Sequence, residues 1–390
     1  MNSNPGSTRS PNDFPGGTQT ARIIAALDAL KAHGGGTLEL AADTISLPNT
    51  NTWTITESIV LASNTTLYLN HCRLKLADGV YDTIIRNEGI VIDEANPNGF
   101  ARELKRDSNI KIIGSGIDSA FIEGPDIQYA APHPVRGGKP VPWIGDYFGW
   151  RTISILFANV HGYEIGGFSM RKTTCWAISQ EHGCEDMHIH DIDFLTTVKN
   201  GDGIDFRKGC RNGLVERITG ACADDVIACT ALGGFTDFPK KTVNSNEYYN
   251  FPLEVGGRSA RIEDDVIENI EIRDIKASSK CHTIICLAGG GPKVRNITAT
   301  DVEDNMTYAA LQVVAVYTGY GTSAASGDIS NVHMKNIISN NSPMTLLVNA
   351  PLENSSFDAV VQRKAGGKTY QIQPPYDTQM KNVRITDAAH

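Results

Sequence analysis

The chain lacks any run of about 18 consecutive apolar residues, the length that a membrane-spanning helix needs. Its first residues, MNSNPGSTRSPNDFPGG, contain neither the basic stretch nor the apolar stretch of a signal peptide. We therefore expect no membrane partner. If Met1 is the native start, the sequence favours a cytoplasmic protein; otherwise the protein is secreted and its signal has been removed.

Positive charge, aromatic residues and closely spaced cysteines are also scarce. The formal net charge is -9 and no long Lys/Arg cluster occurs, which argues against a nucleic-acid partner. Aromatic residues make up 7% of the chain and glycines number 37, a composition that favours many tight turns over large packed helices. The eight dispersed cysteines do not imply disulfides and show no zinc-site spacing, although CHTIIC, residues 281–286, places three candidate ligands on one expected strand. We expect no metal and no cofactor.

A short pattern recurs along the chain: Asn or Asp, then alternating apolar and polar residues, often with a second Asn or Asp. Alternation at period two is typical of a strand that buries one face. Successive copies start at positions 162, 186 and 212, and the longer interval from 212 to 269 is interpreted as two repeats with an added loop. The copies are NIKIIGS (from Asn109), GYEIGGF (Gly162), DMHIHDI (Asp186), NGLVERI (Asn212), NIEIRDI (Asn269), NITATDV (Asn296), NVHMKNI (Asn331) and NVRITDA (Asn382).

Strands that recur at this short interval, without helical segments between them, predict an all-β coil of short parallel strands, the right-handed parallel β-helix. Asparagines at the same point of each turn of the coil should stack in a hydrogen-bonded ladder. Residues 18–33 predict an amphipathic helix that caps the exposed strand edges at the N-terminal end. We expect one domain over 1–390, and the sequence leaves a homo-oligomer open.

Two stretches interrupt the repeat. Residues 124–150 are rich in proline, glycine and aromatic residues, and residues 233–252 are polar with several tyrosines and phenylalanines. Long loops on a rigid scaffold are where binding residues usually lie. We therefore expect both loops to wall a cleft, with aromatic residues such as Tyr249 as candidate platforms for a sugar ring.

Three aspartates follow the spacing of the repeat. Asp202 lies in NGDGID, and Asp224 and Asp225 lie one repeat length later in GACADDVIAC. One turn of the coil should place Asp202 and Asp224 at similar positions in adjacent layers. Repulsion among clustered carboxylates raises the pKa of at least one of them, which provides the acid and the base of glycosidic-bond hydrolysis. The alternative is that all three are solvated turn residues.

The segment 151–228, with its NGDGID and GACADD motifs, resembles glycoside hydrolase family 28, the polygalacturonase family, among the pectin-lyase-like β-helices. That family carries Asn-Thr-Asp followed one turn later by Gly-Asp-Asp. The resemblance implies that Asp224 is the general acid, that Asp202 and Asp225 position and deprotonate the water, and that the anomeric centre is inverted. Asn200 occupies the place of the family's asparagine.

The sequence also departs from the family. Gly201 replaces the threonine and Ala223 the glycine of the two aspartate motifs. The place of the family's Gly-His-Gly is assigned to NFPLEVGG, with Phe251 where the histidine would be, and its Arg-Ile-Lys is missing from KCHTIICLAGGG. These losses predict a neutral or only partly charged oligo- or polysaccharide as substrate, unless Lys240, Lys241 and Arg258 of the inserted loop supply new cations.

Five further residues are candidate substrate contacts: Gln180, His182, Asp205, Arg207 and His282. Lone polar residues beside a turn, such as Gln180 and His182, are more often structural than substrate contacts. Asp205 with Arg207 is equally interpretable as an ion pair on one strand face. Two other functions stay open. A polysaccharide lyase or uronate epimerase would need a basic residue such as Lys199, Arg207 or Lys208, and a non-enzymatic glycan-binding solenoid would not need the aspartates.

Overall fold

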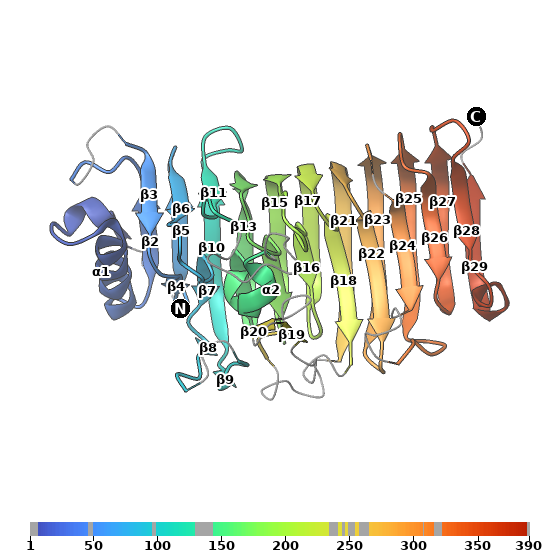
Figure 1. The fold of residues 1–390 in the computed structure, drawn as a ribbon, viewed down its shortest axis with the longest axis horizontal. Coiled ribbons are helices and arrows are strands. Elements are labelled where there is room, and N and C mark those ends of the chain that lie inside the picture. Colours follow the sequence, from blue (N-terminus) through green and yellow to red (C-terminus); the bar gives the residue numbers. More distant parts are fainter. Residues whose placement is uncertain are drawn as a thin grey trace.

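The computed structural model describes residues 7–45, 50–95, 99–128, 143–233, 241–243, 246–248, 254–256, 265–306, 308–315 and 322–387. Parallel strands stack one after another along the long axis of the molecule, with the C-terminal strands at the end opposite helix α1 (Figure 1). The structure confirms the predicted right-handed parallel β-helix.

Two long sheets line the coil. Over the described residues the longer one has 15 strands and the other has 10. The strands of the longer sheet are β1 (Thr8–Arg9), β2 (Gly36–Leu40), β3 (Thr52–Ile55), β5 (Thr65–Leu69), β6 (Arg73–Leu76), β10 (Asp107–Gly114), β11 (Phe121–Glu123), β13 (Val160–Arg171), β15 (Glu185–Leu195), β17 (Arg211–Cys222), β21 (Val266–Ser279), β23 (Lys293–Asp304), β25 (Ile329–Ser339), β27 (Leu352–Gln362) and β29 (Met380–Asp387). Those of the second sheet are β4 (Ile59–Leu61), β7 (Ile85–Asn87), β12 (Ile155–Ala158), β14 (Ile178–Glu181), β16 (Ile204–Phe206), β18 (Ile227–Leu232), β22 (His282–Gly289), β24 (Ala309–Ala315), β26 (Met344–Asn349) and β28 (Lys368–Ile372).

The remaining elements are short, apart from one helix. Two antiparallel strand pairs lie outside the coil: β8 (Ile90–Val91) with β9 (Glu103–Leu104), and β19 (Lys241–Val243) with β20 (Asn246–Tyr248). The helices are α1 (Gln19–Ala32) and α2 (Gly145–Phe148), with 3₁₀ turns at Pro11–Asp13, Gly149–Thr152 and Tyr376–Gln379. Among the described residues, no helix combines the length and the apolar character needed to span a membrane.

The interior of the coil is filled by residues at equivalent positions of successive strands. One such column runs through Ile189, Val215, Ile272, Ala299 and Met334, which the strand registers place level with one another. Each of these side chains is at most 2% exposed. Because alternate residues of a strand point to opposite faces, the period-two pattern of the sequence produces this core directly.

Asparagine recurs at this position because of its backbone conformation as well as its side-chain hydrogen bonds. The first residues of seven copies, from Asn109 to Asn382, have φ between +52° and +60°, the left-handed region that Asn and Asp tolerate better than other non-glycine residues. Their side chains form the predicted ladder. Asn269 donates to Asn212 and accepts from Asn296, each at 3.0 Å.

Replacing a ladder residue should therefore remove two kinds of stabilisation. We expect Asn269→Ala to lower the free energy of unfolding by about 1–2 kcal/mol, mainly because alanine is strained at φ +58°. Asn269→Gly relieves that strain and loses only the exposed side-chain hydrogen bonds, so it should cost less. Urea unfolding of both variants measures the difference, and equal losses would contradict the backbone explanation.

Helix α1 closes the N-terminal end of the coil, as predicted (Figure 1). Thr18 caps the helix by accepting a hydrogen bond from the Ala21 backbone at 3.2 Å, and His33 ends it. Ile23, Ala26 and Leu30 are fully buried in the main core. The helix therefore continues the hydrophobic interior beyond the exposed strand edges at the N-terminal end of the coil.

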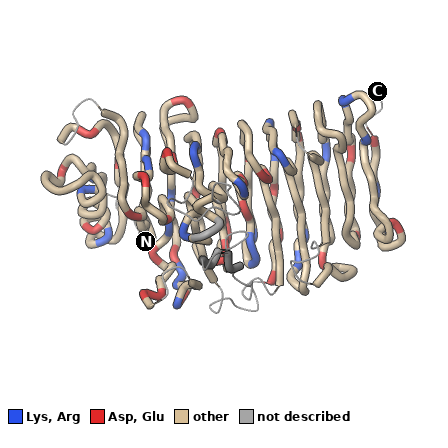
Figure 2. The backbone as a smooth tube through the Cα atoms, in the orientation of Figure 1, with Lys and Arg blue, Asp and Glu red and all other residues tan. Residues whose placement is uncertain are grey.

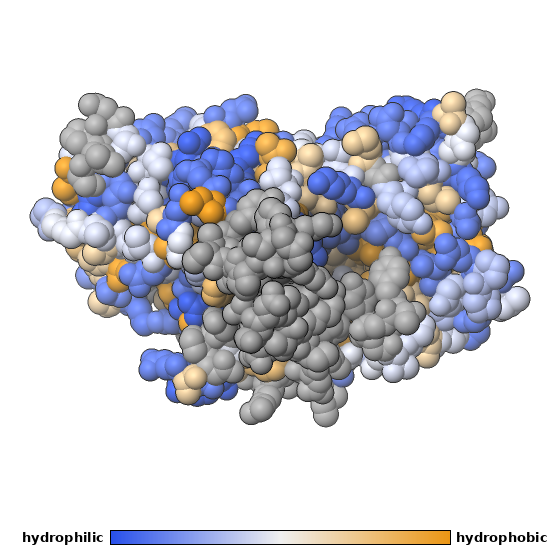
Figure 3. Space-filling model, in the orientation of Figure 1, coloured by the Kyte–Doolittle hydropathy of each residue, from blue (hydrophilic) through white to orange (hydrophobic). Residues whose placement is uncertain are grey.

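Charged residues of both signs recur along the length of the coil (Figure 2). Many pair across neighbouring strands: Arg295 with Glu268 at 2.7 Å is one example. The described surface in Figure 3 is mainly hydrophilic, with small hydrophobic spots between polar residues. Each such exposed pair contributes little to stability, but together the pairs balance positive and negative charges on neighbouring strands.

One prediction about the repeat is wrong. The interval from Asn212 to Asn269 does not contain two turns of the coil, because β17 pairs directly with β21, with Leu214 level with Glu271. The second sheet agrees, since β18 pairs directly with β22. The extra residues between β18 and β21 thus form an insertion within one turn. The turn of the coil that stacks on the aspartates is therefore the one that contains β22.

Candidate active site

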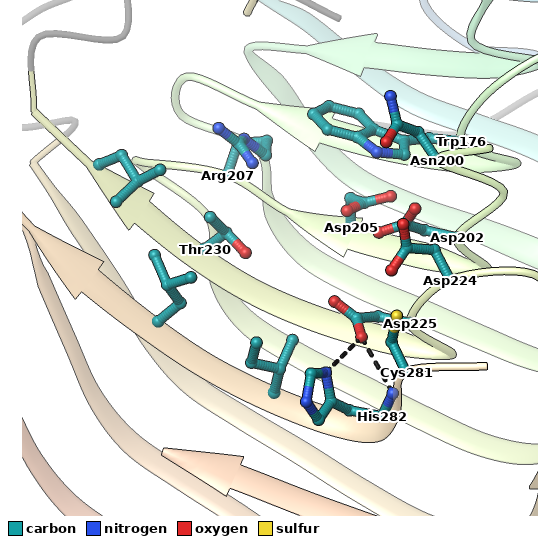
Figure 4. A pocket seen from close by; sticks show the side chains of 13 residues that line it. Trp176, Asn200, Asp202, Asp205, Arg207, Asp224, Asp225, Thr230, Cys281 and His282 are labelled. Carbon is teal, nitrogen blue, oxygen red and sulfur yellow. Dashed lines mark hydrogen bonds and ion pairs between the residues drawn. The ribbon is translucent and has the colours of Figure 1, made fainter. Parts of the chain in front are cut away.

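The aspartates belong to a column that crosses four successive turns of the coil. Strands β14, β16, β18 and β22 align Ile178, Ile204, Ile227 and Ile284. Two residues before each isoleucine, the same registers place Trp176, Asp202, Asp225 and His282 one above another. All four residues line one pocket (Figure 4).

Asp225, rather than Asp224, is therefore level with Asp202, which corrects the predicted alignment. The Gly203 amide donates to the Asp225 carbonyl at 2.9 Å, and the Asp224 amide donates to the Gly201 carbonyl at 3.3 Å. Asp224 and Asp225 lie in the bend between β17 and β18. Their side chains are therefore not forced to opposite faces, as those of consecutive strand residues are. Both side chains consequently face the same pocket.

Glycine is required at position 201, where the segment before β16 packs against the bend that holds Asp224 and Asp225. A Cβ there would lie 2.7 Å from the Val198 carbonyl oxygen and 3.2 Å from the Ala223 Cβ. Thr196 Oγ1 holds the same bend by accepting a hydrogen bond from the Ala223 amide at 2.9 Å. Gly201 and Ala223 are thus packed against each other, and this contact keeps the aspartates in place.

Four carboxylates gather in the pocket: Asp202, Asp205, Asp224 and Asp225 (Figure 4). A carboxylate oxygen of Asp224 lies within 4.8 Å of one of Asp225. Within the described part of the chain, Asp202 Oδ1 and Asp205 Oδ2 are buried without a hydrogen-bond partner. Buried acceptors without partners are uncommon in folded proteins and often mark functional positions.

Burial and mutual repulsion set the protonation of this cluster. Burial, followed by the charge of Asp225, raises the pKa of Asp224 to about 6, while Cys281 and His282 oppose the rise. The pKa values of Asp202 and Asp205 are raised well above their usual range, again mainly by burial, and Arg207 opposes the rise at both. The cluster therefore holds protons near neutral pH, as an acid–base site requires.

His282 positions one carboxylate. Asp225 Oδ1 accepts a hydrogen bond from the His282 amide at 3.1 Å and lies 2.7 Å from the ring nitrogen Nδ1 (Figure 4). Tyr308, one turn further along, meets the His282 ring edge-on with 6.0 Å between centroids. His282 thus fixes the orientation of Asp225 with two contacts to one oxygen.

This register also corrects the placement of the missing family motifs. The turn that follows Asp225 in space contains Cys281-His282-Thr283, so a histidine does stand one turn after the aspartate pair. Phe251 lies outside the described residues. The turn after that contains residues 308–315, YAALQVVA, which include no cation. A histidine therefore lies one turn after the aspartate pair, at position 282 rather than 251, whereas residues 308–315 of the next turn include no lysine or arginine.

Arg207 lies on the other side of the pocket and is held in place by its neighbours. Its guanidinium lies over the Trp176 ring, 4.9 Å from the centroid, and donates to Glu254 at 3.1 Å. Glu254 is fully buried and its Oε2 lies 3.9 Å from the Lys208 ammonium. Arg207 thus lines the pocket as part of an ionic network.

That network contains two carboxyls with opposite pKa shifts. Burial would raise the pKa of Glu254, but the hydrogen bond with His182 and the charge of Arg207 lower it to about 2. Burial raises the pKa of Glu181 to about 7. Glu181 accepts a hydrogen bond from the Val255 amide at 2.6 Å, so the network fastens residues 254–256 to the coil.

Two predicted contacts do not reach the pocket. Gln180 points into the coil, is 0% exposed, and accepts a hydrogen bond from the Tyr163 hydroxyl at 2.6 Å. His182, at φ +44°, is buried beneath residues 254–256, with Nε2 3.4 Å from Glu254 Oε2. Both therefore lie outside the pocket, which agrees with the interpretation of these residues as structural rather than as substrate contacts.

The other predicted residues divide into those that line the pocket and those that cannot be placed. Asn200, Asp202, Asp205, Arg207, Asp224, Asp225 and His282 line it. Tyr249 lies outside the described residues, as do most of the two loops expected to wall the cleft. The described parts of 124–150 and 233–252 contribute no lining residue.

Sequence reasoning missed several lining residues: Trp176, Thr230, Leu232, Cys281, Ile285 and Leu287. Trp176 could have been found by counting one turn back from Asp202. The apolar members are harder to find, because Leu232, Ile285 and Leu287 look like ordinary core residues. They form a separate buried cluster on the outer face of β18 and β22, with Ala228 and Val314. The pocket therefore has an acidic end and an apolar end.

No model of a known protein family and no curated protein sequence matches the chain. Solved structures do match over nearly its whole length. An exopolygalacturonase from Thermotoga maritima has a TM-score of 0.60 at 14% identity, covering 98% of this chain and 92% of that one. A polygalacturonase from Erwinia carotovora ssp. carotovora has a TM-score of 0.54 at 16% identity, covering 99% and 98%. The tailspike protein of E. coli bacteriophage HK620, in complex with a pentasaccharide, has a TM-score of 0.58 at 12% identity, covering 97% and 66%. At these identities the chain shares the parallel β-helix fold of these proteins.

Proposed function

We propose that the chain is a glycoside hydrolase of the polygalacturonase type that cleaves an oligo- or polysaccharide with inversion. The observation that carries the proposal is the column of Asp202, Asp225 and His282, with Asp224 beside it in the same pocket. The exopolygalacturonase and polygalacturonase neighbours support it at the level of the fold. The tailspike neighbour, in complex with a pentasaccharide, supports a carbohydrate ligand.

Each carboxylate has a role that its surroundings favour. Asp224, with a pKa of about 6, is suited to protonate the leaving glycosidic oxygen. Asp225, oriented by His282, is suited to accept the proton of the attacking water. Asp202 lies level with Asp225 and is suited to position that water.

A lyase or epimerase mechanism has less support. It needs a basic group to take a proton from the sugar ring. Arg207 is bound to Glu254, and Lys208 lies between Glu254 at 3.9 Å and Asp265 at 3.8 Å. Positively charged groups held in ion pairs are poor bases. In contrast, the aspartates that hydrolysis would use line the pocket.

The substrate is proposed to be neutral or only partly charged. Among the described lining residues Arg207 is the one arginine or lysine, and Glu254 already binds it. A uronate carboxylate in the pocket would meet four aspartates and the apolar wall of Leu232, Ile285 and Leu287. Its desolvation and repulsion would be poorly compensated.

A panel of neutral and uronate-containing glycans, followed by reducing-end detection, tests this proposal. We expect kcat/KM on the best neutral glycan to exceed that on polygalacturonate by at least about tenfold, equivalent to about 1.4 kcal/mol. Efficient cleavage of polygalacturonate that weakens with salt would contradict the specificity, and would show that cations outside the described residues bind the substrate.

A further inference from the structure

A second cluster of polar side chains lies on the outer face of the longer sheet. Glu164 belongs to β13, and His188 and His190 belong to the next strand, β15. The register places Glu164 level with His188, and His190 lies two residues further on the same face. This cluster is on a different sheet from the carboxylate pocket, so its role is independent of the proposed hydrolase function.

We propose that Glu164, His188 and His190 bind a divalent transition-metal ion. One ligand atom from each residue lies within 4.8 Å of those of the other two. His190 Nε2 faces Glu164 Oε1 at 3.2 Å, and the two imidazole rings lie side by side with centroids 4.2 Å apart. Two imidazole nitrogens and one carboxylate oxygen form the type of ligand set that Zn²⁺ uses when it keeps an open position.

A carboxylate behind one histidine supports this assignment. His190 Nδ1 lies 2.7 Å from Asp191 Oδ2, and Arg217 holds Asp191 through two hydrogen bonds of 2.7 and 2.8 Å. With its proton on Nδ1, His190 presents the lone pair of Nε2 toward Glu164. Metal-binding histidines almost always have such a partner on the second nitrogen, which fixes the ring and raises its basicity.

The backbone makes room for the ring of His190. Gly166 lies level with His190 on the neighbouring strand, and a Cβ there would lie 2.2 Å from the His190 carbonyl oxygen and 2.9 Å from both Cε1 and Nδ1 of its ring. The ring therefore occupies the space of an absent side chain. Glycine inside a strand weakens it, so close approach by a neighbouring group is the usual reason for its presence.

The charges and exposure of the cluster suit an ion from solvent. Lys111 donates to Glu164 Oε2 at 2.7 Å, which leaves Oε1 directed toward His190. The His188 side chain is 37% exposed and that of Glu164 is 30% exposed. Glu216 Oε1 lies 3.1 Å from His188 Nε2 but also pairs with Arg217 at 2.5 Å, so the fourth position of the ion is left to solvent.

The nitrogen ligands define the class of ion. Hard cations such as Mg²⁺ and Ca²⁺ prefer all-oxygen sites, whereas imidazole suits Zn²⁺, Co²⁺, Ni²⁺ and Cu²⁺. We therefore expect the full chain, after treatment with EDTA, to bind Zn²⁺ and Co²⁺ in the micromolar range or tighter. A large excess of Mg²⁺ should not displace them.

Titration with Co²⁺, followed by its visible d–d absorption, and competition with Zn²⁺ test the proposal. His188→Ala combined with His190→Ala should abolish the absorption. Asp191→Asn, which keeps the ligands and alters only the partner of His190, should weaken binding by about 10–100-fold. His333→Ala is the matched control, because the registers place His333 in the same column as His188, with an exposed ring on β25.

Circular dichroism melting in EDTA checks that each variant folds, and Glu164→Gln replaces the double variant if that one does not. Wild-type binding that is lost in the ligand variants and kept in His333→Ala supports the site. Failure of the wild type to bind Co²⁺ or Zn²⁺, or equal binding by the ligand variants, would show that these residues make only ion pairs and would overturn the proposal.

Discussion

Asp224→Asn should lower kcat on the best glycan substrate by at least about a hundredfold, the usual scale of a general-acid contribution. Asparagine keeps the size of the side chain but has no acidic proton to transfer to the leaving oxygen. The free energy of unfolding should not fall by more than about 1–2 kcal/mol, because the substitution removes one of four mutually repelling carboxyls. Initial rates and urea unfolding measure the two quantities.

Asp28→Asn, at an exposed position of α1, is the matched control and should leave kcat unchanged. The pH dependence gives a second check on Asp224. Its pKa of about 6 means that the acid is protonated below pH 6 and ionised above it, so kcat/KM should fall as pH rises through 6. Full activity in Asp224→Asn would remove the acid assignment.

Arg207→Met should destabilise the protein by about 3–5 kcal/mol, the usual cost of breaking a buried ion pair by removing one partner. The Arg207 side chain is 2% exposed and that of Glu254 is 0% exposed, with 3.1 Å between the guanidinium and the carboxylate. Methionine matches the length of the arginine stem but leaves the Glu254 charge buried with weaker partners. Urea unfolding at pH 7 measures the loss.

A double-mutant cycle separates the ionic contribution from packing. Arg207→Met combined with Glu254→Met removes both charges, and it should cost less than the sum of the single losses. Arg295→Met is the surface control: Arg295 pairs with Glu268 at 2.7 Å but is 45% exposed, so its loss should stay below about 1 kcal/mol. Equal losses in Arg207→Met and Arg295→Met would mean that the buried network does not stabilise the site.

The fold could be predicted because its signal is repeated. Each copy of the pattern specifies the same inward face and the same left-handed asparagine, so errors in one copy are corrected by the others. The terminal helix was predictable for a similar reason, since Ile23, Ala26 and Leu30 mark one helical face and a glycine run follows it.

The site was predictable only where consecutive turns have regular lengths. Asp202 and Asp225 are separated by one regular turn and lie level, one residue away from the predicted match with Asp224, whereas His282 lies much further along the chain because an insertion lengthens the turn after Asp225. The sequence indicated His282 as a candidate contact, but counting residues could not place it level with Asp225. The pairing of β18 with β22 puts His282 in the same column as Asp202 and Asp225.

Gln180 shows a different limit. Its neighbour in the register, Phe206, lies inside the coil, and so does Gln180, because both occupy inward positions of their strands. A polar residue at an inward position violates the binary pattern, so the sequence indicated Gln180 as a candidate substrate contact beside a turn. The Tyr163 hydroxyl, which satisfies its oxygen inside the coil, comes from a strand of the other sheet, so no local pattern reveals it.

Hydrolysis by the carboxylate pocket is tested most directly by the first product released from the best glycan. Proton NMR during the first turnovers should show a saturated sugar with a new reducing end whose anomeric configuration is opposite to that of the cleaved bond. An unsaturated product would indicate a lyase. Tight binding without any new reducing end would indicate a glycan-binding protein, and either result would contradict the proposed hydrolysis.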